Sequence, residues 1–334
     1  MASHGSLVST RVQPSCARSL GVSSPQTRFE PSAKPLFRHF PLRSTASRPA
    51  AALTEKLRAS GIMEGSGFDS EGREFKSAEE MWTEEIGKEG DVHKRKEWYR
   101  QGVGYWEKGV EATTNGVLGG YAHVNDADIK GSEAFLKMLL AECFPGGGRD
   151  RDLVALDCGS GIGRVTKNLL IRFFSEKLRE SLVPESGTAI ENKATNFFCV
   201  PLQEFTPDVG RYDVIWIQWC IGHLADDDFV SFFMRAKQNI FQAGLKPGGL
   251  FILKENTARS GFVLDKEDRS ITRSDTYFKE LFHRCGLHIF KSKDQWGLPE
   301  ELFAVKMYAL TPDAPKRVHN TRAKAQANRP GIIK

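Results

Sequence analysis

Residues 154–164 read VALDCGSGIGR: a short apolar run ends at Asp157, and three glycines follow at alternate positions. The run predicts a buried strand, and the glycines predict a sharp turn into a helix. Glycine has no Cβ, so the backbone can bend tightly there and a ligand can approach it, while free N–H groups at the helix start face that ligand. We expect a nucleotide-like cofactor at this turn; a strand-to-helix turn without a ligand is the alternative.

Strands and helices alternate after this turn, which predicts an α/β fold with a doubly wound, Rossmann-like parallel sheet of the seven-strand type. The near-continuous apolar run at 212–219 is typical of a strand buried on both faces. The expected strands are 153–157, 196–202, 212–219 and 249–255, the expected helices are 164–174, 226–241 and 275–285, and a hairpin of 287–292 and 302–310 closes one edge. Helices expected at 78–87, 93–108 and 131–143 form an N-terminal helical cap over the cofactor end.

The second strand of such a sheet is missing from its usual place in the sequence. It should follow the first helix and end in an acidic residue that binds the ribose hydroxyls about 20 residues after the glycines. Residues 175–182 instead have an amphipathic helical pattern, and the residues up to 195 are mainly polar. We therefore expect that this strand is deleted, with Glu176 or Glu180 as a substitute for the acidic residue.

Length and composition indicate the domain organisation. The chain has 334 residues, of which 40% are hydrophobic, enough for one large domain at roughly 78–310. Residues 1–53 carry six Arg and one Lys against the single acid Glu30, so residues 1–60 are predicted to be a transit peptide or a disordered extension. Residues 311–334 are predicted to form a disordered basic tail.

Composition also argues against several classes of function. Much of the excess positive charge lies at the chain ends, so the near-neutral domain argues against a nucleic-acid partner. No apolar segment approaches the roughly 20 residues needed to cross a membrane. The six cysteines have no CxxC pair or metal-ligand spacing and are interpreted as buried free thiols, so we expect no metal site. The acidic run 226–228 is interpreted as N-terminal helix charge.

Four segments carry more specific information. They are NGVLGGY at 115–121, LDCG at 156–159, IWIQW at 215–219 with IGHL at 221–224, and KEN at 254–256 with residues 261–268. In this order they resemble the signature motifs of the protein N-terminal methyltransferases, which methylate the α-amine of proteins beginning Xaa-Pro-Lys with S-adenosylmethionine (SAM) as donor. The resemblance covers roughly residues 98–310. The glycine spacing also resembles the first motif of SAM methyltransferases more than the Gly-x-Gly-x-x-Gly of dehydrogenases.

The resemblance implies a cofactor site, a peptide channel and a reaction centre at the strand ends. The residues implied for SAM binding are Gly159, Arg164, Leu202, Gln203 and Gln218. Those implied for substrate binding are Tyr105, Trp106, Leu118 and Trp219 in the channel, and Asp265 and Ser270 at the lysine of the substrate. Those implied to surround the reacting amine are His223, Asn256 and Asp268.

These residue types suit methylation of an amine. An α-amine has a pKa of about 7.7 to 8.0, so one carboxylate or imidazole is enough to remove its proton. Asp268 or His223 could accept that proton, and Asn256 could orient the nitrogen lone pair. Each assignment has a structural alternative: His223 as a core histidine, residues 265–268 as a solvated loop, and Tyr105 and Trp106 as an ordinary amphipathic helix face.

The sequence is also compatible with two other functions. The missing strand motivates an impaired paralogue or splice variant that binds N-terminal peptides without turnover. A small-molecule methyltransferase on the same fold is the second alternative. The resemblance implies a cytoplasmic location, with the nucleus as a second compartment, whereas residues 1–53 offer plastid or mitochondrial targeting as the alternative.

Overall fold

The computed structural model describes residues 7–10, 65–88, 91–145, 153–174, 194–237 and 244–312, and for 7–10 it describes the backbone pairing. The predictions for the remainder of residues 1–60 and for the basic tail lie outside the described residues. The same holds for Glu176 and Glu180 as substitutes for the ribose-binding acid.

A seven-stranded sheet forms the centre of the molecule, with strand order β10-β11-β7-β6-β4-β1-β5. The strands from β7 to β5 are parallel to one another, and β11 is antiparallel to both β7 and β10, so the predicted α/β class and the edge hairpin are confirmed. The bounds are β1 Leu7–Thr10, β4 Ala155–Cys158, β5 Ala194–Phe198, β6 Tyr212–Gln218, β7 Leu245–Thr257, β10 His288–Asp294 and β11 Ala304–Thr311.

The N-terminus supplies the strand that the sequence lacks after the first helix. Strand β1 lies between β4 and β5, with Leu7 opposite Ala155 and Ser9 opposite Asp157 on one side. On its other side it pairs with Asn196–Phe198 of β5. The expected deletion therefore leaves no gap in the sheet, and these four residues differ from the predicted transit-like or disordered extension. Sequence periodicity missed them because a four-residue segment with only two apolar residues, far from the domain in sequence, carries no local sign of its partner strands.

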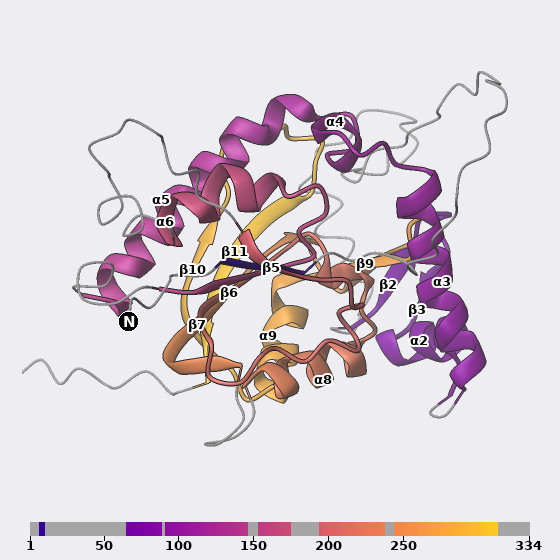
Figure 1. Ribbon diagram of the computed structural model, residues 1–334. Coiled ribbons are helices and arrows are strands. Elements are labelled where there is room, and N and C mark those ends of the chain that lie inside the picture. Colours follow the sequence, from indigo (N-terminus) through magenta and orange to yellow (C-terminus); the bar gives the residue numbers. More distant parts are fainter. Residues whose placement is uncertain are drawn as a thin grey trace, which may run out of the picture.

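Helices cover both faces of this sheet (Figure 1). One face carries α5 (Asn125–Cys143), the π-helical turn η2 (Thr166–Leu170) and α6 (Ile171–Phe174), and the other face carries α8 (Asp226–Lys237) and α9 (Asp275–Arg284). Alternate strand residues point to opposite faces, so Val214 and Trp216 of β6 pack toward α5, whereas Ile215 and Ile217 pack toward α8. This is the pattern expected of a strand buried on both sides.

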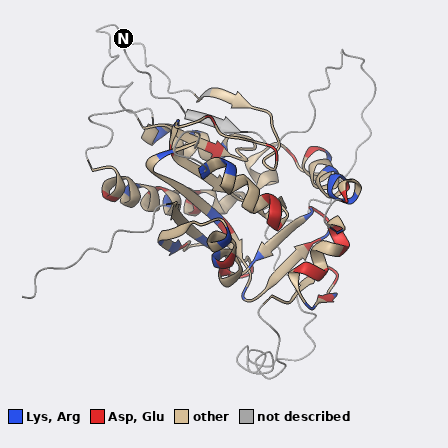
Figure 2. Ribbon diagram, turned by 90° about the horizontal axis from the view of Figure 1, so that it is seen from below, with Lys and Arg blue, Asp and Glu red and all other residues tan. Residues whose placement is uncertain are grey.

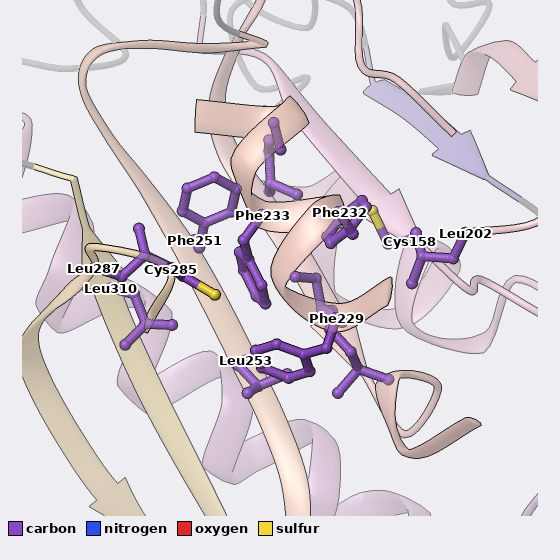
Figure 3. Packing of buried hydrophobic residues seen from close by; sticks show 14 of the residues in the cluster. Cys158, Leu202, Phe229, Phe232, Phe233, Phe251, Leu253, Cys285, Leu287 and Leu310 are labelled. Atoms are coloured by element: carbon purple, nitrogen blue, oxygen red, sulfur yellow. The ribbon is translucent and has the colours of Figure 1, made fainter. Parts of the chain in front are cut away.

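Phenylalanine side chains fill the space between α8 and the sheet. Figure 3 shows Phe233 and Phe229 of α8 facing Phe251 and Leu253 of β7, whereas Phe232 lies on the side of Cys158; these five side chains of α8 and β7 are fully buried. Phe233 and Phe251 meet edge to face with ring centres 5.2 Å apart. Burial of each such side chain contributes about 1.5 to 3 kcal/mol, so this contact holds α8 and the loop before it in a fixed place.

A second, four-stranded sheet lies beside the first and was not predicted. Its strand order is β3-β2-β8-β9. The bounds are β2 Gly67–Asp69, β3 Glu74–Phe75, β8 Phe262–Asp265 and β9 Ser270–Arg273. Helices α2 (Ala78–Ile86) and α3 (Val92–Lys108) pack on it through Met81, Trp82 and Trp98, so β2 and β3, which precede the expected boundary at 78, belong to the same packed unit.

Several element boundaries differ from the sequence-based prediction. Helix α5 begins at Asn125 rather than 131, which brings Asp128 into its first turns, and it follows the short helices α4 (Thr114–Val117) and η1 (Ala122–Val124). Strand β7 begins at Leu245 because the turn at Gly248 forms a bulge within the ladder to β6. Cys199 is exposed and Cys143 is partly exposed, so the prediction of buried thiols fails for these two.

The described helices carry charges of both signs and have moderate hydropathy. None of the described helices is both long enough and apolar enough to span a membrane. Figure 2 shows acidic and basic residues together on several helices. In α8 the first turn is acidic, with Asp226, Asp227 and Asp228. Asp227 and Asp228 of that run pair with Arg95 of α3, so the run also ties the cap to the sheet domain.

Candidate active site

Two adjoining cavities lie beyond the carboxyl ends of β4, β6 and β7. The large cavity has a volume of about 470 Å³ and is lined by the glycine turn, α3 and the segments after β5 and β6. The small cavity, of about 40 Å³, is lined by the end of β7 and by β8, β9 and the loop between them. Trp219 and His223 line both cavities, so these two residues form the wall between them. This is the place where open α/β sheets bind ligands.

The glycine turn has the backbone geometry that the sequence predicts. Gly159, Gly161 and Gly163 all have positive φ, at 67°, 54° and 78°. Residues with a Cβ rarely adopt these angles, so the turn requires glycine at each position. A Cβ added to Gly163 would meet nothing within 4 Å, so it is the conformation rather than lack of space that excludes other residues there.

Arg164 follows the turn and is almost fully buried in the wall of the large cavity. Its Nη1 donates to Asp128 Oδ2 at 2.6 Å and to Asn125 Oδ1 at 3.1 Å. Its Nε and Nη2 have no acceptor among the described residues. One edge of the guanidinium is thus held by protein and the other edge is left for an anionic ligand, the geometry that binds a carboxylate.

Asp157 is the last residue but one of β4, two positions before the first glycine, and it is 2% exposed. Burial raises the pKa of Asp157 to about 7, against the opposing effect of the hydroxyl of Thr166, which donates to its Oδ2.

The turn that carries Trp219 is held by a buried acid that the sequence analysis did not select. Trp219 has φ of 51°, which is uncommon for a residue with a large side chain. Glu255 Oε1 accepts the N–H groups of Cys220 at 3.0 Å and Ile221 at 3.2 Å, and burial raises the pKa of Glu255 to about 7. These bonds satisfy the turn's N–H groups and keep the indole between the two cavities.

His223 is held at both ring nitrogens. Its Nδ1 lies 3.1 Å from the carbonyl oxygen of Arg269, which can only accept, and its Nε2 lies 3.1 Å from Nε1 of Trp106, which can only donate. The ring therefore carries its proton on Nδ1 and is neutral in this arrangement. Gly102 lets α3 approach the loop before β9 closely, because a Cβ there would lie only 3.3 Å from the carbonyl oxygen of Asp268.

Two buried oxygens in the small cavity have no hydrogen-bond donor among the described residues. They are Oδ1 of Asn256, at the end of β7, and Oδ1 of Asp268, in the loop between β8 and β9. Burial raises the pKa of Asp268 to about 6, and the nearby carboxylate of Asp265 acts in the same direction, although a hydrogen bond from Ser270 lowers it in part. A buried acceptor without a donor is costly, so the pair fits a ligand that brings N–H groups.

The loop between β8 and β9 is shaped by one of its own carboxylates. Asp265 Oδ1 accepts the N–H groups of Glu267 at 2.8 Å and Asp268 at 3.4 Å. Asp265 also lines the small cavity, together with Ser270, which pairs with it across the two strands. It can therefore serve both the turn and a cationic ligand.

The predicted site residues come together with one exception. The large cavity contains Trp106, Leu118, Gly159, Arg164, Leu202, Gln203, Gln218, Trp219 and His223 in its lining. The small cavity contains Trp219, His223, Asn256, Asp265, Asp268 and Ser270. Tyr105 lines neither cavity; it meets Trp106 edge to face at 5.6 Å. Near the acidic loop, burial raises the pKa of Tyr105 to about 12.

Sequence reasoning missed Glu255, Asp128 and Lys254, all of which are buried beside the cavities. The signal that could have found them is a charged residue within an otherwise apolar strand or helix face, because such a residue needs a buried partner. The described residues contain no group of three side chains that could hold a metal ion.

The sheet order, the glycine turn and the large cavity define a SAM-dependent methyltransferase of Rossmann-like fold. Residues of this chain fit that cofactor: the glycine turn and the open edge of Arg164 suit its amino-acid end, and the backbone beside Leu202 and Gln203 suits its adenine. The chain belongs to the family described as AdoMet dependent proline di-methyltransferase, which matches residues 94–311.

Individual relatives agree with this assignment. The chain is 65% identical over 279 residues to alpha N-terminal protein methyltransferase 1 of Arabidopsis thaliana, covering 80% of this chain and 99% of that protein. It is 36% identical over 226 residues to N-terminal Xaa-Pro-Lys N-methyltransferase 1 of Mus musculus, covering 66% and 97%. A SAM-dependent methyltransferase from Leishmania major has a similar solved structure, with a TM-score of 0.60, 37% identity and coverage of 75% and 97%.

Proposed function

We propose that this enzyme methylates the N-terminal α-amine of proteins that begin Xaa-Pro-Lys. The observation that carries the proposal is the pair of buried, unpartnered oxygens on Asn256 and Asp268 in an acidic cavity that adjoins the cofactor cavity. An amine has the N–H groups that these oxygens lack. The activities for which the relatives are named support the same substrate class.

The cofactor, when bound, supplies an electrophilic methyl group on a sulfonium sulfur. The residues of the chain position the two reactants. Trp219 lies between the two cavities, so the amine nitrogen in the small cavity reaches the methyl group in the large cavity beside this indole. Holding the two reacting atoms about 3 to 3.5 Å apart and in line accounts for much of the rate in such reactions. The indole faces of Trp219 and Trp106 favour a cationic amine and keep water out.

Asp268 is the residue of this chain best placed to take the proton. The amine must lose one proton so that its lone pair can form the new N–C bond, while the S–C electron pair stays on sulfur. Asp268 is buried and its pKa of about 6 is brought closer to that of an α-amine, which makes the transfer easier. His223 has its Nε2 lone pair engaged by Trp106, so its role is to hold the channel wall. Asn256 accepts from the amine and directs its lone pair.

The acidic loop accounts for a lysine at the third position of the substrate. Asp265 faces the small cavity next to Asp268 and is partly exposed, so a lysine side chain can reach it from the solvent side. An ion pair of this kind adds selectivity at a modest energy, at most about 1 kcal/mol.

A labelled-methyl transfer assay with the full chain tests the proposal. A Ser-Pro-Lys peptide should be methylated at its N-terminus, an N-acetylated copy should not, and a Ser-Pro-Gln peptide should react more slowly. SAM binding without transfer to any peptide would favour the impaired peptide-binding alternative. Equal rates with the lysine and glutamine peptides would contradict the protein-substrate assignment.

A further inference from the structure

A buried ionic cluster lies directly behind the cofactor cavity. At its centre Asp128 of α5 is fully buried and contacts three side chains from three other segments. Arg164 Nη1 donates to its Oδ2 at 2.6 Å, Gln218 Nε2 donates to Oδ1 and Oδ2 at 2.9 and 3.1 Å, and Lys254 Nζ lies 2.5 Å from Oδ1. Arg164 and Gln218 line the large cavity, whereas Asp128 and Lys254 do not.

We propose that Asp128 is a positioning residue for the cofactor, holding Arg164 and Gln218 so that their remaining hydrogen-bonding edges point into the cavity. The carboxylate accepts from Nη1 of Arg164, and Nε and Nη2 have no acceptor within the described part of the chain. It also fixes the amide of Gln218, because Nε2 donates to Asp128 while Oε1 accepts from Nε1 of Trp216 at 3.1 Å.

Lys254 keeps Asp128 ionised. Burial alone would raise the pKa of Asp128, but Lys254 and Arg164 hold it below its ordinary value. Lys254 is itself fully buried and fixed by Ser132 Oγ at 2.8 Å and Gln295 Oε1 at 2.7 Å. The ammonium group of Lys254 thus has partners on α5, in the segment after β10 and on Asp128 itself. Through Lys254, these elements together hold the carboxylate of Asp128 in place.

The charges of the cluster point to the ligand group it serves. Two cations, Arg164 and Lys254, share the single carboxylate of Asp128, so one positive charge remains within the hydrogen-bonded cluster. A carboxylate of the ligand at the open edge of Arg164 balances it. Asp128 therefore acts on the amino-acid end of the cofactor and leaves its adenosine end untouched, which separates this role from a general effect on folding.

The test compares two ligands by calorimetry, without any peptide. S-adenosylhomocysteine has the amino-acid group, and 5′-methylthioadenosine has the same adenosine and thioether without it. In Asp128→Asn we expect the Kd of S-adenosylhomocysteine to rise about tenfold or more, as for loss of a charged hydrogen bond, and that of 5′-methylthioadenosine to change less than about twofold. Equal weakening of both ligands, or no weakening of either, would overturn the proposal.

Two further variants keep the test decisive. Asp213→Asn removes another fully buried carboxylate, paired with Lys246 at 2.6 Å at the opposite end of β6, and should change neither Kd. If Asp128→Asn does not fold, Asp128→Asn with Lys254→Met removes one charge of each sign from the interior, and the same selective loss is expected. In a double-mutant cycle, Arg164→Ala should cost less in Asp128→Asn than in the wild type; additive losses would show that Asp128 does not act through Arg164.

Discussion

The indole of Trp106 stands perpendicular to the imidazole of His223, with ring centres 5.8 Å apart and the indole N–H directed at Nε2. The bond joins the cap helix α3 to the short helix η3 (Ile221–His223) that follows β6. It also uses the only lone pair of the neutral ring, so proton acceptance by His223 would first require the bond to break.

This relationship predicts that His223→Gln keeps most of the activity. A glutamine amide can accept from Trp106 with its oxygen and donate to the carbonyl of Arg269 with its nitrogen, but it cannot take a proton. We expect kcat within about tenfold of the wild type, and a larger loss in His223→Leu, which has neither group. A drop of about 10²-fold or more in His223→Gln would instead identify His223 as the base.

Asp268 is expected to determine the acidic side of the pH profile. Its pKa is about 6, so at lower pH it is protonated and cannot take the proton of the amine. We expect kcat at saturating substrate to fall as the pH drops through about 6. In Asp268→Asn, kcat should be about 10²- to 10⁴-fold lower and this dependence should be absent, with a smaller effect on peptide affinity.

The sign of the stability effect supplies the folding control for that variant. A carboxyl whose pKa is raised by burial favours the folded state only at pH below that pKa, and its ionised form weakens the fold at higher pH. Asp268→Asn removes the ionised carboxylate that weakens the fold at high pH. The thermal midpoint of this variant at pH 8 should therefore be no lower than that of the wild type. If the midpoint of Asp268→Asn is lower than that of the wild type, its loss of activity is explained by a less stable fold and not by the loss of a proton acceptor.

Asp265→Asn should reduce selectivity for lysine. Asparagine keeps the oxygen that accepts from Glu267 and Asp268, so the turn is preserved while the charge is removed. We expect the KM for a Ser-Pro-Lys peptide to rise by up to about fivefold, with little change for Ser-Pro-Gln. Glu267→Gln, on the same loop but exposed and outside the cavity lining, is the matched control and should leave both values unchanged.

Arg273 is expected to be important for stability rather than for catalysis. It is fully buried at the end of β9, and its guanidinium donates to Asp226 Oδ1 at 2.7 Å and to the carbonyl of Leu224 at 2.7 Å. Arg273→Leu should lower the free energy of unfolding by about 3 to 5 kcal/mol in a urea titration. Pairing it with Asp226→Leu should recover part of that loss; a double variant that is less stable than either single one would show that the ion pair is not the cause.

Sequence reasoning succeeded where the signal is local. The strand at β4, the glycine turn and the largely apolar, fully buried β6 follow from adjacent residues, and the motifs at the strand ends identified the lining of both cavities. It failed where a residue depends on a distant partner. Asp128 resembles a helix-start residue until Lys254 and Arg164, which are far away in the sequence, are placed next to it.

The second sheet was missed for a related reason. Strands β8 and β9 have four residues each, and β2 and β3 are shorter still, so each run is too brief to show periodicity. They become strands because β8 pairs with both β2 and β9, and because Phe262 and Leu264 pack against α2 and α3. The loop between β8 and β9 carries Asp265 and Asp268, so this overlooked sheet positions the acidic part of the site.

The N-terminal strand gives the last prediction. Strand β1 has a neighbouring strand on each side, β4 and β5. Val8→Pro removes a backbone hydrogen-bond donor from this strand, and proline is tolerated in sheets almost only in edge strands. We expect Val8→Pro to lower the thermal midpoint by at least about 5 °C and to speed amide hydrogen exchange in β4 and β5. Val8→Thr, which keeps the backbone N–H and the β-branched shape, is the control. Because Ser9 lies opposite Asp157 in the ladder, disruption should also weaken SAM binding at the adjoining glycine turn.

A deletion of residues 1–12 should behave like Val8→Pro and should regain stability when a peptide of residues 1–14 is added. Unchanged midpoints and exchange rates in both variants would mean that the N-terminus does not complete the sheet.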